Sequence, residues 1–105
     1  MSDRIAKIQS LLASEPDSEM LQYMLAMEHR KSGDDESALQ GFAQLQKREP
    51  PHVPSFLMGA QLLAELSRTE EARTALRIGI EAARDQGNSH AAGEMAELLA
   101  SLGAE

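Results

Sequence analysis

The residues best able to do chemistry in this chain are three histidines and a few neighbouring carboxylates. Imidazole and carboxylate groups can bind zinc or exchange protons, provided that several of them meet at one point. His29, His52 and His90 lie far apart in the sequence, and no HExxH pattern places two histidines on one helix face. Only His90 and Glu94 have the i,i+4 spacing of helical neighbours, and two ligands do not make a metal site. We therefore expect no bound metal.

The adjacent acidic pairs have a simpler role than acid–base catalysis. Asp34-Asp35 and Glu70-Glu71 each stand where a helix is expected to begin, so they can cap free N–H groups and interact with the positive end of the helix dipole. Glycine-rich phosphate loops are also missing, because Gly87 and Gly93 are isolated and follow no predicted strand. The sequence predicts no catalytic residues and no cofactor, and we expect that the protein is not an enzyme.

Length and composition indicate one small domain in a reducing compartment. The 105 residues suffice for a single hydrophobic core without disulfide bonds or metals, and the sequence has no cysteine. The N-terminus lacks a basic region followed by an apolar run, and nowhere do 18 apolar residues follow one another. We expect a cytoplasmic protein with neither a secretory signal nor a membrane span.

The charge distribution argues against nucleic acid and against anionic membranes as partners. The net charge is -7, and the ten basic residues are scattered along the chain. The densest basic run lies between 68 and 84 and is interleaved with acidic residues, with Arg77 and Glu81 at i,i+4 spacing. This pattern predicts a solvated helix surface whose charges pair with one another.

Apolar residues follow helical spacing throughout, and no stretch alternates as a half-buried strand would. Prolines, glycines and capping residues divide the chain into six expected helices. They run from a cap near Ser2 to Pro16, from Asp17 or Ser18 to Gly33, from Asp34 to Pro50, from near Pro54 to about Leu66, from a cap at Thr69 to about Gln86, and from Asn88 or Ser89 to about Leu102.

A repeat of 34 residues joins these helices into hairpins. Pro16 and Pro50 are separated by this distance, and Ala72 and Leu76 stand in register with Ala38 and Phe42. We therefore predict one domain over 1–105, with a half-repeat over 1–18, repeats over 19–52 and 53–86, and a capping helix over 88–102. A helical array of this kind offers a surface for binding and no obvious catalytic pocket.

The repeat landmarks resemble those of the tetratricopeptide repeat (TPR) family. They comprise Leu25, Ala26, Gly33, Ala38, Phe42 and Pro50 in one repeat and Phe56, Ala60, Ala72 and Leu76 in the next. Gln22 and His29 depart from the aromatic residues usual at their positions. The resemblance implies an all-α solenoid of about six antiparallel helices, wound as a right-handed superhelix.

The resemblance also implies where a partner binds. In TPR proteins the first helix of each repeat lines a concave groove that receives an extended peptide or a partner helix. The corresponding residues here are Met20, Tyr23, Met27, Arg30, Leu57, Met58 and Gln61. One TPR subclass grips a C-terminal carboxylate with lysine, asparagine and arginine, but the matching positions here hold Tyr23, Met27, Met58 and Gln61.

Two hypotheses follow for this methionine-rich stripe. In the first, the chain is an adaptor whose groove binds a protein or peptide, because flexible methionine side chains suit varied apolar partners. In the second, two copies bury the stripe against each other as a structural homodimer or assembly subunit. Both require that the stripe is exposed, whereas the methionines could instead fill the core or lie beneath a terminal helix.

Overall fold

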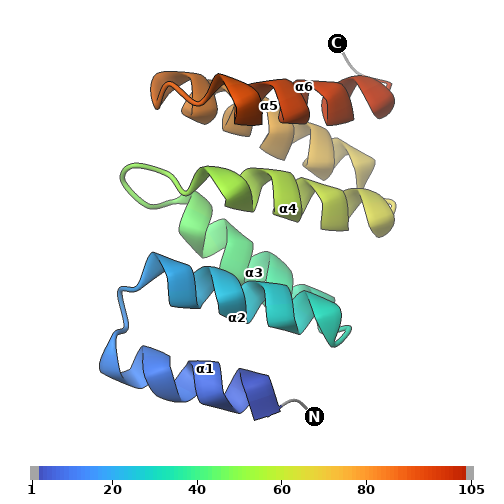
Figure 1. Ribbon diagram of the computed structural model, residues 1–105. Coiled ribbons are helices and arrows are strands. Elements are labelled where there is room, and N and C mark those ends of the chain that lie inside the picture. The colour runs from blue at the N-terminus through green and yellow to red at the C-terminus, as the bar shows by residue number, and fades with distance from the viewer. Residues whose placement is uncertain (1–2, 104–105) are drawn as a thin grey trace.

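The computed structural model describes residues 3–103 and consists of six α-helices with no strand in that range. The helices are α1 (Asp3–Ser14), α2 (Glu19–Lys31), α3 (Asp35–Gln46), α4 (Val53–Glu65), α5 (Thr69–Asp85) and α6 (Ser89–Ser101). Consecutive helices run in opposite directions (Figure 1). The all-α class and the six helices predicted from the sequence are confirmed; the expected cap at Ser2 lies outside the described residues.

The helices form an elongated stack of hairpins with extents of 41 × 29 × 18 Å. In Figure 1, α2, α4 and α6 lie side by side in front, with α3 and α5 behind them and α1 at the N-terminal end. Each helix packs against the next one in the chain, and α4 also contacts α6. We call the side of α2, α4 and α6 that is turned away from α3 and α5 the three-helix face.

Polar side chains cap the helices largely where the sequence predicts. Ser18, Asp34 and Asn88 each accept a hydrogen bond from a backbone N–H three residues further on. The predicted cap at Thr69 is wrong, because Thr69 is already the first residue of α5 and Arg68 holds the cap position without a side-chain cap bond.

Turn geometry explains why Arg68 holds the cap position. Gly33 ends α2 with φ +89°, and Ser67, 34 residues later, ends α4 with φ +63°. In both turns the next residue donates its N–H to a carbonyl five residues back, as in a Schellman motif: Asp34 to His29, and Arg68 to Leu63. The repeated turn therefore fixes the position of the cap, and the second repeat has an arginine there.

Small residues allow the helices of each hairpin to approach closely. Ala26, Ala38, Ala60 and Ala72, which the sequence predicts at these contacts, are at most 1% exposed. Gly79 marks the closest approach, since a Cβ built there would lie 2.5 Å from Phe56 Cβ and 2.7 Å from Met95 Sδ. This contact offsets the unfavourable helix propensity of glycine.

The basic run pairs with its own acidic neighbours, as expected, but through different partners. Arg68 pairs with Glu71, Arg73 with Glu70, and Arg84 with Glu81, each at i,i+3 spacing. The predicted pairing of Arg77 with Glu81 is wrong, because Glu81 turns toward Arg84, 3.1 Å away.

Candidate partner-binding surface

The residues predicted to bind a partner meet at the seam between α2 and α4. Tyr23 and Met27 of α2 and Met58 of α4 are half-buried and pack against one core cluster, formed by Ala26, Ala38, Phe42 and Leu62. Their inner atoms therefore contribute to the core, while their outer atoms are accessible to a partner. We call Tyr23, Met27, Arg30, His52, Met58 and Glu65 the α2–α4 seam.

Arg30 bridges the seam at its C-terminal end. Its Nη2 lies 2.8 Å from Glu65 Oε2, and its Nη1 lies 3.5 Å from the Met58 carbonyl oxygen and 3.9 Å from Met58 Sδ. The predicted binding residues Arg30 and Met58 are thus in direct contact. The contact joins two helices that belong to different hairpins and sets their spacing at this surface.

Tyr23 and His52 bridge the other end of the seam. Their ring centroids are 4.9 Å apart at an angle of 52°, and His52 Nδ1 lies 2.7 Å from the hydroxyl of the buried Ser55. Burial lowers the pKa of His52, opposed by the nearby Glu19 carboxylate and reinforced by Arg48. Burial raises the pKa of Tyr23, with the charge of Arg30 acting in the opposite direction. Both pKa shifts favour uncharged rings at this joint.

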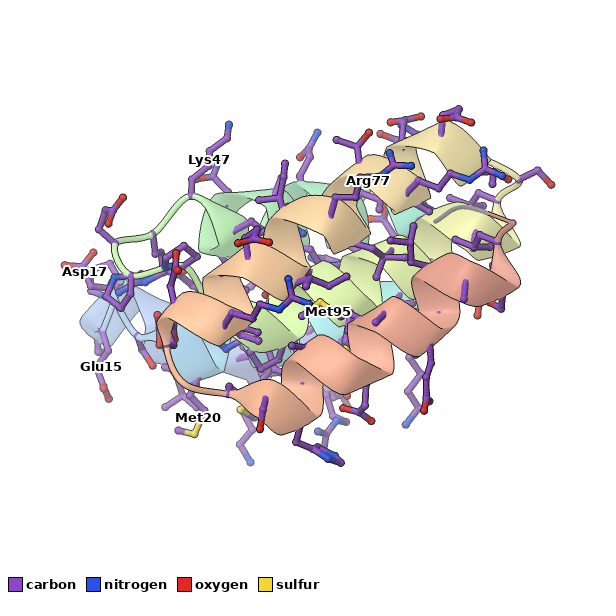
Figure 2. All side chains as sticks on the ribbon, turned by 90° about the horizontal axis from the view of Figure 1, so that it is seen from above. Glu15, Asp17, Met20, Lys47, Arg77 and Met95 are labelled. Atoms are coloured by element: carbon purple, nitrogen blue, oxygen red, sulfur yellow. The ribbon has the colours of Figure 1, made fainter. Side chains whose placement is uncertain are left out.

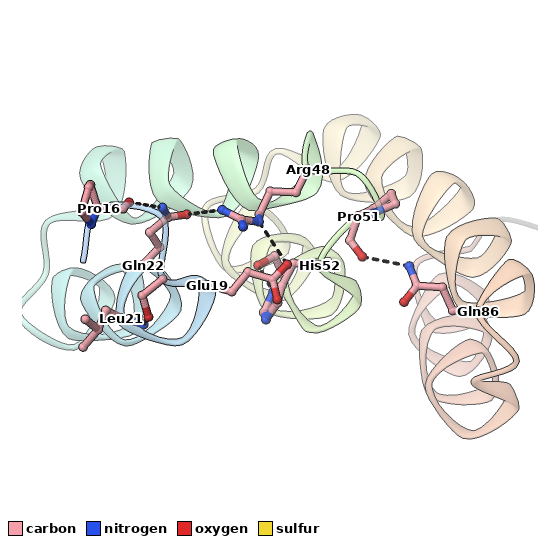
Figure 3. Close-up of polar contacts among 10 residues, drawn as sticks. Pro16, Glu19, Leu21, Gln22, Arg48, Pro51, His52 and Gln86 are labelled. Carbon is pink, nitrogen blue, oxygen red and sulfur yellow. Dashed lines mark hydrogen bonds and ion pairs between the residues drawn. The ribbon is translucent and has the colours of Figure 1, made fainter.

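A polar network near His52 ties the loop between α3 and α4 to the start of α2. Arg48 Nε donates to Glu19 Oε2 over 3.1 Å, and Gln22 Nε2 donates to the Pro16 carbonyl over 2.8 Å (Figure 3). At the next hairpin, Gln86 Nε2 donates to the Pro51 carbonyl over 2.9 Å. These bonds position the loops at one edge of the stack and so hold Tyr23 beside His52.

The remaining predicted residues extend the surface beyond the seam. Met20 is 68% exposed and projects away from the stack in Figure 2, whereas Met95 lies between α5 and α6. Leu57 and Gln61 are half-buried on α4, and Leu57 packs against a larger core cluster formed by buried residues of α4, α5 and α6. No terminal helix covers Met20, so part of the stripe is open to a partner.

A cleft opens where the seam meets the C-terminal ends of α2 and α4. It has a volume of about 520 Å³, and its walls include Met27, Arg30, Leu62 and Glu65. The other lining residues are Glu28, Lys31 and Asp35, so two apolar side chains lie among five charged ones. A few polar groups beside apolar ones can hold one side chain of a partner in a defined orientation.

A second cleft, which was not predicted from the sequence, lies between α2 and α3. It has a volume of about 420 Å³ and is lined by Gln22, Leu25, Ala26, His29, Ser37, Gln40, Gly41 and Gln44. The next hairpin has a cleft in the equivalent place, between α4 and α5. Its volume is smaller, about 260 Å³, and Phe42 and Gln46 of α3 form part of its wall. The residue that could have indicated the larger cleft is Gln22. It occupies the position at which the second repeat has the aromatic residue Phe56.

Residues 3–103 contain no group of three or more histidine, cysteine, aspartate or glutamate side chains suited to a metal ion. His90 Nε2 and Glu94 Oε1, the one pair singled out in the sequence, are 3.8 Å apart at the surface of α6. None of the six described helices combines the length and hydropathy needed to cross a bilayer.

Comparison with known proteins agrees with this architecture. The solution NMR structure of a tetratricopeptide repeat domain protein from Salinibacter ruber superposes with a TM-score of 0.78 at 29% sequence identity, covering 83% of this chain and 88% of that one. The chain has the TPR fold. No protein-family model matches it, and no curated protein matches it by sequence. This outcome suits the departures from the TPR pattern at Gln22 and His29, and the structural match supports the resemblance carried by the other landmarks.

The TPR fold is a helical repeat commonly used for protein–protein interaction, and it typically carries binding surfaces rather than catalytic sites. The fold alone does not identify a partner, so function has to be argued from the residues on the surface of this chain. The half-buried residues of the α2–α4 seam and the exposed Met20 beside it are part of that surface.

Proposed function

We propose that this chain is a protein-interaction adaptor that binds a peptide or helix of another protein across the α2–α4 seam. The observation that carries the proposal is the combination of the half-buried apolar residues Tyr23, Met27 and Met58 with the cleft beside Arg30. Apolar atoms that are already ordered lose little entropy when a partner covers them. A protein partner, rather than nucleic acid or a membrane, suits the net charge of -7, and the lack of cysteine suits the cytoplasm.

Replacement of Met27 by glutamate tests the proposal. A carboxylate at this half-buried position should abolish capture of the partner, because an apolar contact is replaced by a charge that must lose water. The measurement is a pull-down from lysate of the source cell, with captured proteins identified by mass spectrometry. Ile78→Glu is the matched control, since Ile78 is 55% exposed on α5 and lies outside the seam. It should leave capture intact.

Two further measurements separate the alternatives. Thermal unfolding of Met27→Glu shows whether Met27 belongs mainly to the core. If it does, the melting temperature falls strongly, and the loss of binding is explained by unfolding of the protein. Sedimentation of the wild type over a range of concentrations tests the homodimer hypothesis. A dimer that Met27→Glu dissociates would overturn the adaptor proposal and assign the seam to self-assembly.

A further inference from the structure

The glutamates of the helices fall into two groups. Of nine glutamates in the six described helices, seven have a carboxylate oxygen within 3.4 Å of an arginine nitrogen. The other two, Glu94 and Glu97, lie on α6, which contains neither lysine nor arginine. Glu94 has only the exposed His90 at 3.8 Å, and Glu97 forms no ion pair within residues 3–103. The negative charge of α6 is therefore largely uncompensated.

Helix register places these carboxylates on the three-helix face. Counted from their first residues, Val53 and Ser89, the buried Phe56 and Leu63 of α4 correspond to the buried Ala92 and Leu99 of α6. The two helices therefore bury the same side of their cylinders, and they lie next to each other in Figure 1.

The same count matches Met58 with Glu94 and Gln61 with Glu97. The positions that hold the uncharged Met58 and Gln61 on α4 therefore hold carboxylates where the surface continues onto α6.

The residues around the two carboxylates leave them open. A Cβ built at Gly93 would meet no atom within 4 Å, and Ala96 and Ala100 are exposed with only a methyl group each. No large side chain of α6 therefore shields Glu97 from a partner. The acidic end of the face is accessible to long cationic side chains such as those of lysine and arginine.

We propose that the partner segment is cationic and apolar, with lysine or arginine side chains that meet Glu94 and Glu97 and apolar side chains that cover the α2–α4 seam. This inference rests on the proposed function, because it identifies the class of partner for the same face. Charge complementarity at a partly exposed rim mainly selects the partner and speeds its association, while the apolar contacts provide most of the affinity. Removing both carboxylates should therefore weaken binding about tenfold without abolishing it.

Peptide display tests the inference even though the natural partner is unidentified. A random library of 16-residue peptides, about the length of a peptide that spans three helices, is selected against the wild type, against Glu94→Gln/Glu97→Gln, and against Glu94→Lys/Glu97→Lys. The wild type should enrich peptides that combine apolar residues with lysine or arginine. The glutamine variant should lose the basic enrichment and keep the apolar one, and the lysine variant should enrich aspartate and glutamate instead.

Control variants make the outcomes distinguishable. Glu36→Lys/Glu81→Lys makes the same change in net charge at exposed glutamates of α3 and α5, and it should select the same peptides as the wild type. Equal changes in both charge variants would show a general effect of net charge and overturn the inference. Apolar peptides without basic enrichment, lost with Met27→Glu, would overturn it while supporting the proposed function. Selection of no peptide by the wild type would contradict both proposals.

Discussion

The two central hairpins share one fold, but their core clusters contain very different numbers of buried residues. The α4–α5 hairpin and α6 supply the twelve buried residues of one core cluster, whereas the cluster at α2–α3 has four, and one of these, Leu62, belongs to α4. The first hairpin therefore depends on the second for part of its core, as expected when repeats stabilise one another through their interfaces. The seam proposed to bind a partner lies at the cluster with fewer buried residues, where half-buried side chains complete the packing.

The closest helix contacts give the strongest test of this difference. Gly79→Ala should destabilise the protein by about 3 kcal/mol, because the new methyl group would overlap Phe56 and Met95 in the larger cluster. Gly41→Ala should cost about 1 kcal/mol, since its Cβ would meet only Ala26, with the Cβ of that alanine at 2.9 Å, and the helix gains propensity. Urea denaturation provides both values.

Gly93→Ala is the control for these substitutions, because its Cβ would meet nothing within 4 Å. It should leave stability unchanged or raise it by up to about 1 kcal/mol through helix propensity alone. Equal losses at Gly79 and Gly41 would contradict the contrast between the two hairpins.

Replacing buried alanines by leucine tests the difference between the two core clusters. Ala38→Leu should destabilise the protein by about 1–3 kcal/mol, because the alanine is fully buried between α2 and α3 and a larger residue would force the helices apart. Ala72→Leu, at the corresponding position of the second hairpin, should cost more, since the larger cluster has less freedom to adjust. The denaturation midpoint is the measurement. A midpoint for Ala38→Leu equal to that of the wild type would refute the assigned packing.

At the turns, one residue of each repeat can be replaced by the residue at the equivalent position of the other repeat. Ser67 has the left-handed backbone conformation that Gly33 has in the first repeat, and this conformation costs a residue with a side chain about 1 kcal/mol. Ser67→Gly should therefore stabilise the protein by up to about 1 kcal/mol, and Gly33→Ser should destabilise it by a similar amount. Thermal unfolding measures both changes. Destabilisation by Ser67→Gly would show that the serine side chain has a stabilising role of its own.

Acidification tests the contact between Tyr23 and His52, which joins the two hairpins, and should have the smallest effect on stability. Burial keeps the pKa of His52 below its ordinary value of 6.5, so the unfolded chain binds more protons than the folded chain as the pH falls below about 6.5. The contribution of His52 to stability is complete above that pH and is lost as the pH falls through the folded pKa. His52→Asn should flatten the dependence of unfolding free energy on pH as the pH falls below about 6.5. His90→Gln, which removes an exposed histidine of α6, serves as the control.

Much of the fold was predictable because its signals are local. Helix caps at Ser18, Asp34 and Asn88 and the turn at Gly33 follow from residue chemistry within a few positions. The cap at Thr69 was predicted wrongly because the turn geometry, set by a hydrogen bond to Leu63, outweighed the preference of threonine for that role.

The candidate site was less predictable because its properties depend on pairing between distant residues. The seven predicted groove residues could be selected from the resemblance to TPR proteins, but the contact of Arg30 with Glu65 joins residues 35 positions apart. The contact between the tilted rings of Tyr23 and His52 and the cleft beside Gln22 likewise arise only when separate helices meet.

The sequence by itself determined the helical class, the 34-residue hairpin period, the small residues at the helix contacts and the net negative charge, because periodicity and composition act along the chain. The tertiary structure decided which charges are compensated and which apolar atoms stay accessible. Glu65 and Glu97 look alike in the sequence, yet the first lies 2.8 Å from Arg30 and the second has no ion-pair partner within residues 3–103. Such differences depend on the distance between side chains of separate helices, which only packing sets.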